Sequence, residues 1–432
     1  AVDRTALEAR HGPVAAAVPL LPLQKGMLFQ SQLGGKASVY NAFTALDLDG
    51  PLDAGRLGRA FDAVLRRHPQ LAGLFDHDTH GDPLLVIPAL PDGGAGLWPV
   101  EQHDLSGMPP EARAAELARI EAATAERANP TDRFLGLVKA VLIRTAPDRH
   151  RLLIAVHHLV VDGWSTPLLL RDLLTAYARG PDALFPLAIG YPAVVHGLLA
   201  RDVSASRDAW GEALAGATPT VLFDPAGSGG DAPMIEAELA LPAELTDALL
   251  SRLRAEGLTL NALMQAVWGL VLGNLAGRDD VLFGTPVSGR SAAVPGVGEQ
   301  VGLFLNTLPV RVALDPARPL WAQLPAIQER HIALMEHDGL GLSELQATAG
   351  GAALFDTLLV VENYPDSGCE SLDLGGVRVS GVYNRGYSHY PLALLVLPGR
   401  ELTLLVENRG AVPDAMALAE RVRGLLGALV RQ

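Results

Sequence analysis

Strand-like and helix-like segments alternate along most of this chain, and a stretch rich in Pro, Gly and Asp between Arg179 and Pro233 interrupts the alternation. Alternation of this kind is typical of α/β proteins, in which helices cover the faces of a sheet. A chain of 432 residues is also too long for one ordinary hydrophobic core. We therefore predict an α/β fold with two lobes, residues 1–180 and 181–432, joined by a crossover at about 179–233.

Hydrophobic periodicity predicts the elements of each lobe. In the first lobe the expected strands lie within 38–50, 71–87 and 134–163, and the expected helices lie within 51–69, 109–130 and 167–178. In the crossover we expect a helix near 206–216. In the second lobe the expected helices lie within 241–257, 259–277 and 320–337 and after residue 413, and the expected strands lie within 279–289, 354–364, 391–399 and 401–408.

Charge and composition exclude several classes of partner. Acidic residues outnumber basic ones by 48 to 34, giving a net charge of -14, whereas nucleic-acid binding needs a basic face. No apolar run reaches the roughly 18 to 20 residues of a membrane helix. Prolines interrupt the apolar segment 12–23, and Asp3 and Glu8 precede it, so we do not expect a signal peptide. With a single cysteine, Cys369, the chain has no intrachain disulfide, and we expect a cytoplasmic protein.

Two adjacent histidines, His157 and His158, end an apolar strand pattern and precede Asp162 and Gly163. Alternation along a strand would place the two imidazoles on opposite faces. Two hydrogen-bonded core histidines would be a common outcome for such a pair taken alone. A metal site is disfavoured, because adjacent strand residues diverge and no third ligand lies nearby in sequence.

The residues after the histidines favour a catalytic site. Gly163 allows a sharp turn, Ser165 or Thr166 is a typical helix N-cap, and Pro167 suits the first helical position. A neutral imidazole is then held beside a helix N-terminus, where backbone N–H groups stabilise developing negative charge. Such an imidazole has a near-neutral pKa and is suited to general-base catalysis.

The segment HHLVVDG, residues 157–163, resembles the signature of the condensation domains of nonribosomal peptide synthetases. Their superfamily includes chloramphenicol acetyltransferase and other CoA-dependent acyltransferases. Six further segments resemble condensation-domain motifs in the expected order: PLLPLQKGMLFQ (19–30), RHPQLAGLF (67–75), LFGTPVSGR (282–290), VGLFLNTLPVRV (301–312), LFDTLLVVENYP (354–365) and SHYPLALLV (388–396). One departure is Ala72, where the family usually has arginine.

The resemblance implies two chloramphenicol-acetyltransferase-like lobes in a V-shaped pseudo-dimer, with the active site at their junction. It implies an acyltransferase that forms a peptide bond between a donor acyl or peptidyl thioester and the α-amine of an acceptor aminoacyl thioester. Donor and acceptor carrier proteins would deliver both substrates on phosphopantetheine, so the domain itself would bind no cofactor or metal. A neighbouring adenylation domain, in a synthetase for an antibiotic or siderophore, is a further expected partner.

The family's site residues carry over to the matching positions. The resemblance makes His158 catalytic, His157 its structural neighbour, Asp162 a salt-bridge partner and Gly163 the residue whose backbone approaches substrate. We expect Arg290, at the end of the second-lobe strand motif, to pair with Asp162, because an unpaired buried carboxylate is strongly destabilising.

Softer candidates lie around this site. The residues that we expect to line the tunnel to the site are Trp164, Ser165, Ser388, His389 and Tyr390. The segment DHDTH, residues 76–80, looks like a metal cluster, but its place between two strand patterns predicts a solvated turn.

Three functions stay open within the family resemblance. The opening segment LPLQKGMLF, residues 21–29, looks more like the subtype that joins a D-configured donor to an L-configured acceptor than like the L-donor subtype. An epimerisation domain would share the histidine motif and need a glutamate opposite His158, for which Glu362 is the position to check. A non-catalytic, partner-recruiting domain of the same fold would typically have a damaged histidine motif, whereas this motif is intact.

Overall fold

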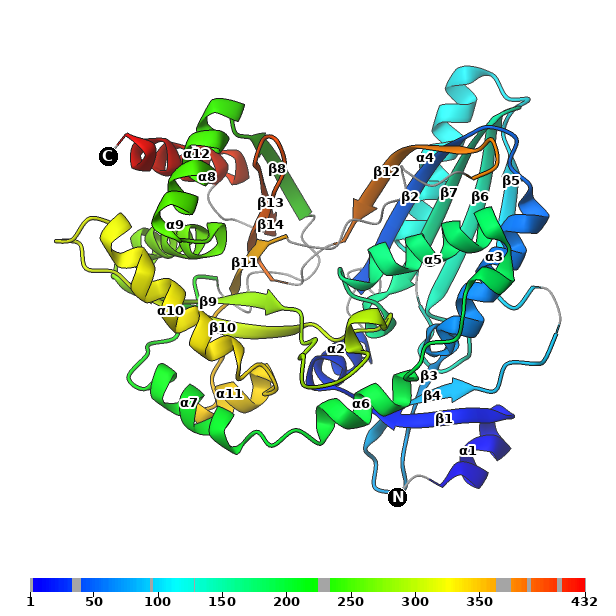
Figure 1. Cartoon of the computed structure of the whole chain (residues 1–432), viewed down its shortest axis with the longest axis horizontal. Coiled ribbons are helices and arrows are strands. Elements are labelled where there is room, and N and C mark those ends of the chain that lie inside the picture. Colours follow the sequence, from blue (N-terminus) through cyan, green and yellow to red (C-terminus); the bar gives the residue numbers. More distant parts are fainter. Residues whose placement is uncertain are drawn as a thin grey trace. The chain divides into compact units, whose positions relative to one another are not determined.

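The computed structural model contains two compact units, each described here by itself (Figure 1). It describes residues 3–32, 40–93, 96–127, 129–223, 234–362, 374–386, 390–409 and 414–431. The first unit comprises Ala1–Ala200, Arg290–Phe304 and Tyr364–Tyr387; the second comprises Arg201–Gly289, Leu305–Asn363 and Ser388–Gln432.

The two units differ from the lobes expected from the sequence. Residues just beyond 180, including α6 (Tyr191–Leu199), belong to the first unit. So do Arg290–Phe304 and Tyr364–Tyr387, which were assigned to the second lobe. Periodicity identifies elements but not the distant elements with which they pair, and it therefore misses segments that return to an earlier unit.

A five-stranded sheet forms the centre of the first unit. Its order is β12 (Arg378–Arg385), β2 (Asn41–Asp49), β7 (Arg149–His157), β6 (Val138–Ala146) and β5 (Val100–Asp104). Neighbouring strands are antiparallel except β5 and β6, which are parallel.

Side-chain alternation assigns each face of this sheet to its helices. Leu46, Leu152 and Ile154 pack in one core with α3 (Ala54–Arg67) and α5 (Ser165–Arg179). The alternate residues Ala45 and Leu153 pack instead with Ile120 of α4 (Pro110–Ala125). Figure 1 shows α3 and α5 on the opposite side of the sheet from α4.

A three-stranded antiparallel sheet completes the first unit. Its order is β1 (Val14–Pro19), β4 (Pro83–Pro88) and β3 (Leu74–His77), and α1 (Arg4–His11) and α2 (Pro22–Gln32) flank β1 along the chain. Val14 and Val18 of β1 are buried. The apolar N-terminal segment therefore forms an edge strand with two buried valines, which explains part of its hydrophobic composition.

A six-stranded sheet forms the second unit. Its order is β10 (Asn306–Ala313), β9 (Asp280–Val287), β11 (Thr357–Val361), β13 (Leu392–Leu397), β14 (Thr403–Arg409) and β8 (Met234–Ala240). The core on one face includes residues of α8 (Ala243–Glu256), α9 (Leu260–Ala276), α10 (Leu324–Met335) and α12 (Ala415–Val430). The core on the other face includes residues of α7 (Ser204–Leu214) and α11 (Leu342–Thr348).

Most predicted elements are present. The expected helix end at Gly257 is confirmed, because this residue follows α8 with a φ of 66° in the left-handed region that favours glycine. Strand β12, which joins the sheet of the first unit, was not anticipated. In the described ranges, no single helix has the length and apolarity of a membrane span; α8 and α9 reach that length only together, and the chain bends by 111° between them.

Candidate functional site

Strand β7 delivers the two histidines to the end of the five-stranded sheet. The strand ends at His157, and His158 begins a short 3₁₀ turn, η3 (His158–Val160). The prediction placed both imidazoles on the strand, facing opposite ways. This is wrong for His158, which lies in the turn after the strand. The turn, and not strand alternation, determines the direction of His158.

His157 is a buried structural residue. Its side chain is 1% exposed, and Nδ1 accepts a hydrogen bond of 3.1 Å from the backbone N–H of Leu159. Burial, together with repulsion from His158, lowers the pKa of His157 to about 3. The imidazole is therefore neutral at pH 7, and it stabilises the turn that contains His158.

His158 has the geometry of a base. Its Nδ1 lies 3.2 Å from the carbonyl oxygen of Val161, and the side chain is half-buried. Because a carbonyl oxygen only accepts hydrogen bonds, Nδ1 carries the proton and Nε2 keeps its lone pair. Burial lowers the pKa of His158, while the carbonyl of Val161 and the charge of Asp162 partly oppose that shift. Nε2 is therefore available to accept a proton at pH 7.

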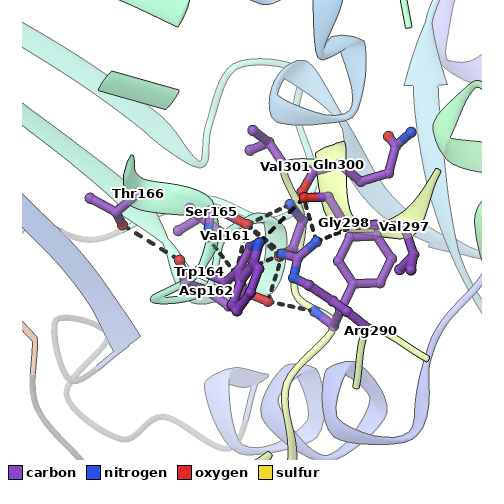
Figure 2. A network of polar contacts seen from close by, with 12 residues as sticks. Val161, Asp162, Trp164, Ser165, Thr166, Arg290, Val297, Gly298, Gln300 and Val301 are labelled. Atoms are coloured by element: carbon purple, nitrogen blue, oxygen red, sulfur yellow. Dashed lines mark hydrogen bonds and ion pairs between the residues drawn. The ribbon is translucent and has the colours of Figure 1, made fainter. Parts of the chain in front are cut away.

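Asp162 and Arg290 form a buried ion pair within the first unit (Figure 2). Nη2 of Arg290 lies 2.9 Å from Oδ1 and 3.1 Å from Oδ2 of Asp162. The side chain of Arg290 is 3% exposed and that of Asp162 is 0% exposed. Burial lowers the pKa of Arg290, and the charge of Asp162 opposes this effect. The structure thus brings together the two residues that the sequence analysis paired.

Further hydrogen bonds surround this ion pair. Ser165 donates to Oδ1 of Asp162 from its backbone N–H at 2.8 Å and from Oγ at 2.6 Å. The backbone N–H of Phe304 donates to Oδ2 at 3.0 Å. Nη1 of Arg290 donates to the carbonyls of Val297 and Gln300 at 2.7 and 2.9 Å. The network therefore fixes the start of α5 to the segment that runs from Arg290 to Phe304 (Figure 2).

The N-terminus of α5 differs from the expected one. The helix starts at Ser165, two residues before the predicted start. The side chain that accepts a backbone N–H at this end is that of Asp162, which accepts the N–H of Ser165, and not that of Ser165 or Thr166. The backbone N–H groups of Ser165 and Thr166 both also point at the carbonyl of Asp162. These two donors are therefore used within the loop and do not serve developing negative charge.

The remaining candidates lie in different surroundings. Gly163 is half-buried in the turn before α5 and is not among the glycines with positive φ, so its backbone conformation does not require glycine. Trp164 is half-buried, and its indole N–H donates to the carbonyl of Gly298 at 3.3 Å. Ser165 is fully buried in the ion-pair network, which gives it a structural role.

The second-unit candidates are only partly described. Tyr390 is buried and stacks on Phe355 with ring centroids 5.8 Å apart. Ser388 and His389 lie outside the described residues. Glu362 follows β11, and burial raises the pKa of its carboxyl group.

The segment DHDTH contains turn and strand residues. Asp76 pairs with Arg10 and His11 of α1, at 2.7 Å in each case, and Asp78 accepts backbone N–H groups within the turn. Over the described ranges, three or more His, Cys, Asp or Glu side chains nowhere gather as a metal site would require.

Sequence reasoning missed the backbone partners of the ion pair. The carbonyls of Val297 and Gln300 and the N–H groups of Gly302 and Phe304 complete the network. A backbone group carries no residue-type signal. Arg290 and the motif at 301–312 therefore pointed to this segment but not to its hydrogen bonds.

A family model described as a condensation domain matches residues 14–410. This chain belongs to the condensation-domain family. Condensation domains are acyltransferases that form amide bonds, so the predicted family and enzyme class are confirmed.

Relatives and solved structures agree with this assignment. The condensation domain is 43% identical to vanchrobactin synthetase VabF of Vibrio anguillarum, over 97% of this chain and 15% of that protein. It is 33% identical to chondramide synthase cmdD of Chondromyces crocatus, over 86% of this chain and 9% of that protein. The chain thus spans a small part of these relatives. The first condensation domain of the CDA synthetase has the same fold, with a TM-score of 0.76 and 24% identity over 96% of both chains.

Proposed function

We propose that this condensation domain joins a donor acyl or peptidyl thioester to the α-amine of an acceptor aminoacyl thioester, with His158 as the catalytic residue. The observation that carries the proposal is the 3.2 Å distance between Nδ1 of His158 and the carbonyl oxygen of Val161. Since a carbonyl oxygen only accepts, we assign the proton to Nδ1, and Nε2 can then accept a proton. Family membership supports the reaction class.

The proposed reaction has two stages. The neutral acceptor amine attacks the carbonyl carbon of the donor thioester, so that a C–N bond forms and the carbonyl oxygen becomes negative. Nε2 of His158 takes a proton from the ammonium nitrogen of this tetrahedral intermediate. The intermediate then collapses, the C–S bond breaks, and the imidazolium returns the proton to the departing thiolate. An α-amine has a pKa near 8, so a useful fraction is neutral at physiological pH.

The other motif residues have positioning roles in this proposal. His157 stabilises the turn through its bond to Leu159, and the Asp162–Arg290 pair anchors the loop that follows His158. Gly163 leaves the loop without a side chain at the point where the substrate would approach its backbone. Trp164, half-buried beside this loop, is a proposed tunnel-lining residue.

Carrier proteins and an adenylation domain are the proposed partners. The two relatives named above are much longer than this chain, which matches only 15% and 9% of their lengths. We infer that donor and acceptor arrive on the phosphopantetheine arms of two carrier proteins, so that the condensation domain needs no cofactor of its own. Residues 21–29 support a D-configured donor and an L-configured acceptor.

Epimerisation is the second candidate. It is favoured by the partial burial of Glu362, which raises the pKa of its carboxyl group, a shift that is common among catalytic acids and bases. Exchange of the α-hydrogen of a carrier-bound aminoacyl group with solvent deuterium, without dipeptide formation, would support this function over amide formation.

A coupling assay tests the main proposal. Donor and acceptor are loaded on separate carrier proteins, and the dipeptide is measured by mass spectrometry. We expect His158→Ala to slow coupling on the order of 10²- to 10⁴-fold. His196→Ala, which removes an exposed histidine of α6, is the matched control and should couple normally. Dipeptide formation that is undiminished in His158→Ala would overturn the role of His158.

A further inference from the structure

We propose that Gly386 is a specificity-determining residue, which keeps open the space at Nε2 of His158 that the α-substituent of the acceptor occupies. This inference rests on the proposed function, because it takes His158 as the group that receives the amine proton. It concerns two residues of the first unit.

Strand pairing brings Gly386 to the catalytic turn. Gly386 directly follows β12, whose residues Asn384 and Arg385 pair with Thr44 and Phe43 of β2. Near the same end of β2, Asn41 pairs with His157. The end of β12 and the turn that begins at His158 therefore lie at the same end of the sheet, separated by one strand (Figure 1).

A side-chain bond fixes this end of β12. Oγ1 of Thr44 donates to Oδ1 of Asn384 at 2.8 Å, two residues before Gly386. The position of Gly386 is therefore determined by the sheet and by a hydrogen bond.

The surroundings of Gly386 point to the catalytic nitrogen. A Cβ atom on this residue would lie 3.7 Å from Nε2 of His158, and this is the one contact within 4 Å that it would make with described residues other than its chain neighbours. The added atom would thus contact the ring nitrogen that keeps its lone pair.

Backbone conformation does not explain the glycine. The φ of Gly386 lies outside the left-handed region, unlike that of Gly257 or Gly277, so an L-residue fits its backbone. Gly386 is also exposed. We therefore infer that residue 386 is glycine because a side chain there would occupy the space beside Nε2 of His158.

That space lies where the acceptor must enter. A base receives a proton when the donor nitrogen comes within about 2.6 to 3.2 Å of it. The α-carbon of the acceptor is bonded to this nitrogen, so its side chain lies within a few ångströms of Nε2. A methyl group on residue 386 would compete for the same volume, and a branched side chain would compete more strongly.

Acceptors of graded size test the inference. Gly386→Ala and Gly386→Val are compared with wild type for kcat and KM, with glycyl and leucyl acceptor thioesters and one common donor. We expect the preference for the glycyl over the leucyl acceptor to rise at least about tenfold in Gly386→Val and less in Gly386→Ala. Equal losses for both acceptors, or no change for either, would overturn the proposal.

A second measurement does not depend on coupling. Diethyl pyrocarbonate modifies exposed imidazole nitrogens, and tandem mass spectrometry separates His158 from His157. We expect slower modification of His158 in Gly386→Val than in wild type. If no variant couples but this slowing is present, the proposed function fails while the placement of Gly386 stands. An unchanged modification rate overturns the inference itself.

Gly58→Ala is the matched control for both measurements. Gly58 lies in α3, and a Cβ atom there would meet nothing within 4 Å. Its acceptor preference and the modification rate of His158 should equal those of wild type. Thermal unfolding of each variant establishes that it is folded. If Gly386→Val does not fold, Gly386→Ala provides a smaller change at the same position.

Discussion

Oδ1 and Oδ2 of Asp162 lie 2.9 and 3.1 Å from a single guanidinium nitrogen of Arg290, and both side chains are almost completely buried. The two residues are 128 positions apart in sequence. Further hydrogen bonds support such a buried pair. Here Ser165 and Phe304 donate to Asp162, and Arg290 donates to two backbone carbonyls. The pair therefore links the loop after His158 to a distant segment of the same unit.

Removing the charge of Asp162 should destabilise the domain. Asp162→Asn leaves Arg290 buried without a counter-charge, and we expect a loss of about 3 to 5 kcal/mol in the free energy of unfolding. Urea unfolding measures this loss. Arg119→Ala, which breaks an exposed pair with Glu116, is the control and should leave the unfolding midpoint unchanged. Equal shifts for both variants would contradict the structural role of the buried pair.

Ser165 and Thr166 provide a matched pair of hydroxyl groups. Oγ of Ser165 donates to Asp162 at 2.6 Å and accepts from the N–H of Gly302 at 3.0 Å, whereas Oγ1 of Thr166 makes only a 3.5 Å contact. We expect Ser165→Ala to cost about 1 to 3 kcal/mol, because it leaves buried groups unsatisfied. Thr166→Ala should cost clearly less in the same urea titration. The reverse order would contradict the described network.

The buried histidines predict acid destabilisation. An unfolded histidine has a pKa of about 6.5, whereas burial lowers the pKa of His157 to about 3 and also lowers that of His158. Below about pH 6.5 the unfolded chain therefore binds protons that the folded chain does not, and stability falls as the pH falls. The window for His157 extends down to about pH 3.

The pH dependence of urea unfolding measures this effect. His157→Gln should reduce the proton uptake on unfolding by about one between pH 4 and pH 6. His196→Gln alters an exposed histidine and serves as the control. If His157→Gln leaves the slope of stability against pH unchanged, His157 is not buried in the neutral form.

The proposed donor subtype predicts stereochemical selectivity. Residues 21–29 resemble the opening of domains that take D-configured donors, so we expect faster coupling with a D-aminoacyl donor than with its L-enantiomer. Both enantiomers are loaded on the donor carrier with one L-configured acceptor, and initial rates of dipeptide formation are compared. Preference for the L-donor would exclude this subtype and leave the amide-forming activity intact.

The sequence predicted the chemistry of the site better than its geometry. The resemblance to condensation domains pointed to His158 and to a salt bridge of Asp162, for which Arg290 was the expected partner. The structure contains this pair, and the catalytic role of His158 stays a proposal. The 3₁₀ turn at His158 and the capping of α5 by Asp162 were missed, because competition among several donors and acceptors in a short loop determines both. The pairing of β12 with β2 was also missed, since periodicity does not reveal strand partners.

Strand β12 has a consequence for how the chain is made. The edge of the first sheet is supplied by Arg378–Arg385, and the partner of Asp162 is supplied by Arg290. In a nascent chain that ends near residue 200, strand β2 is therefore at the edge of the sheet, and Asp162 has no arginine partner because Arg290 has not yet been synthesised. The first unit reaches its final form only after most of the second has left the ribosome. In a chimeric synthetase whose junction lies between the two units, β12 and β2 would come from different parent proteins. A junction outside residues 14–410 keeps both strands from one parent.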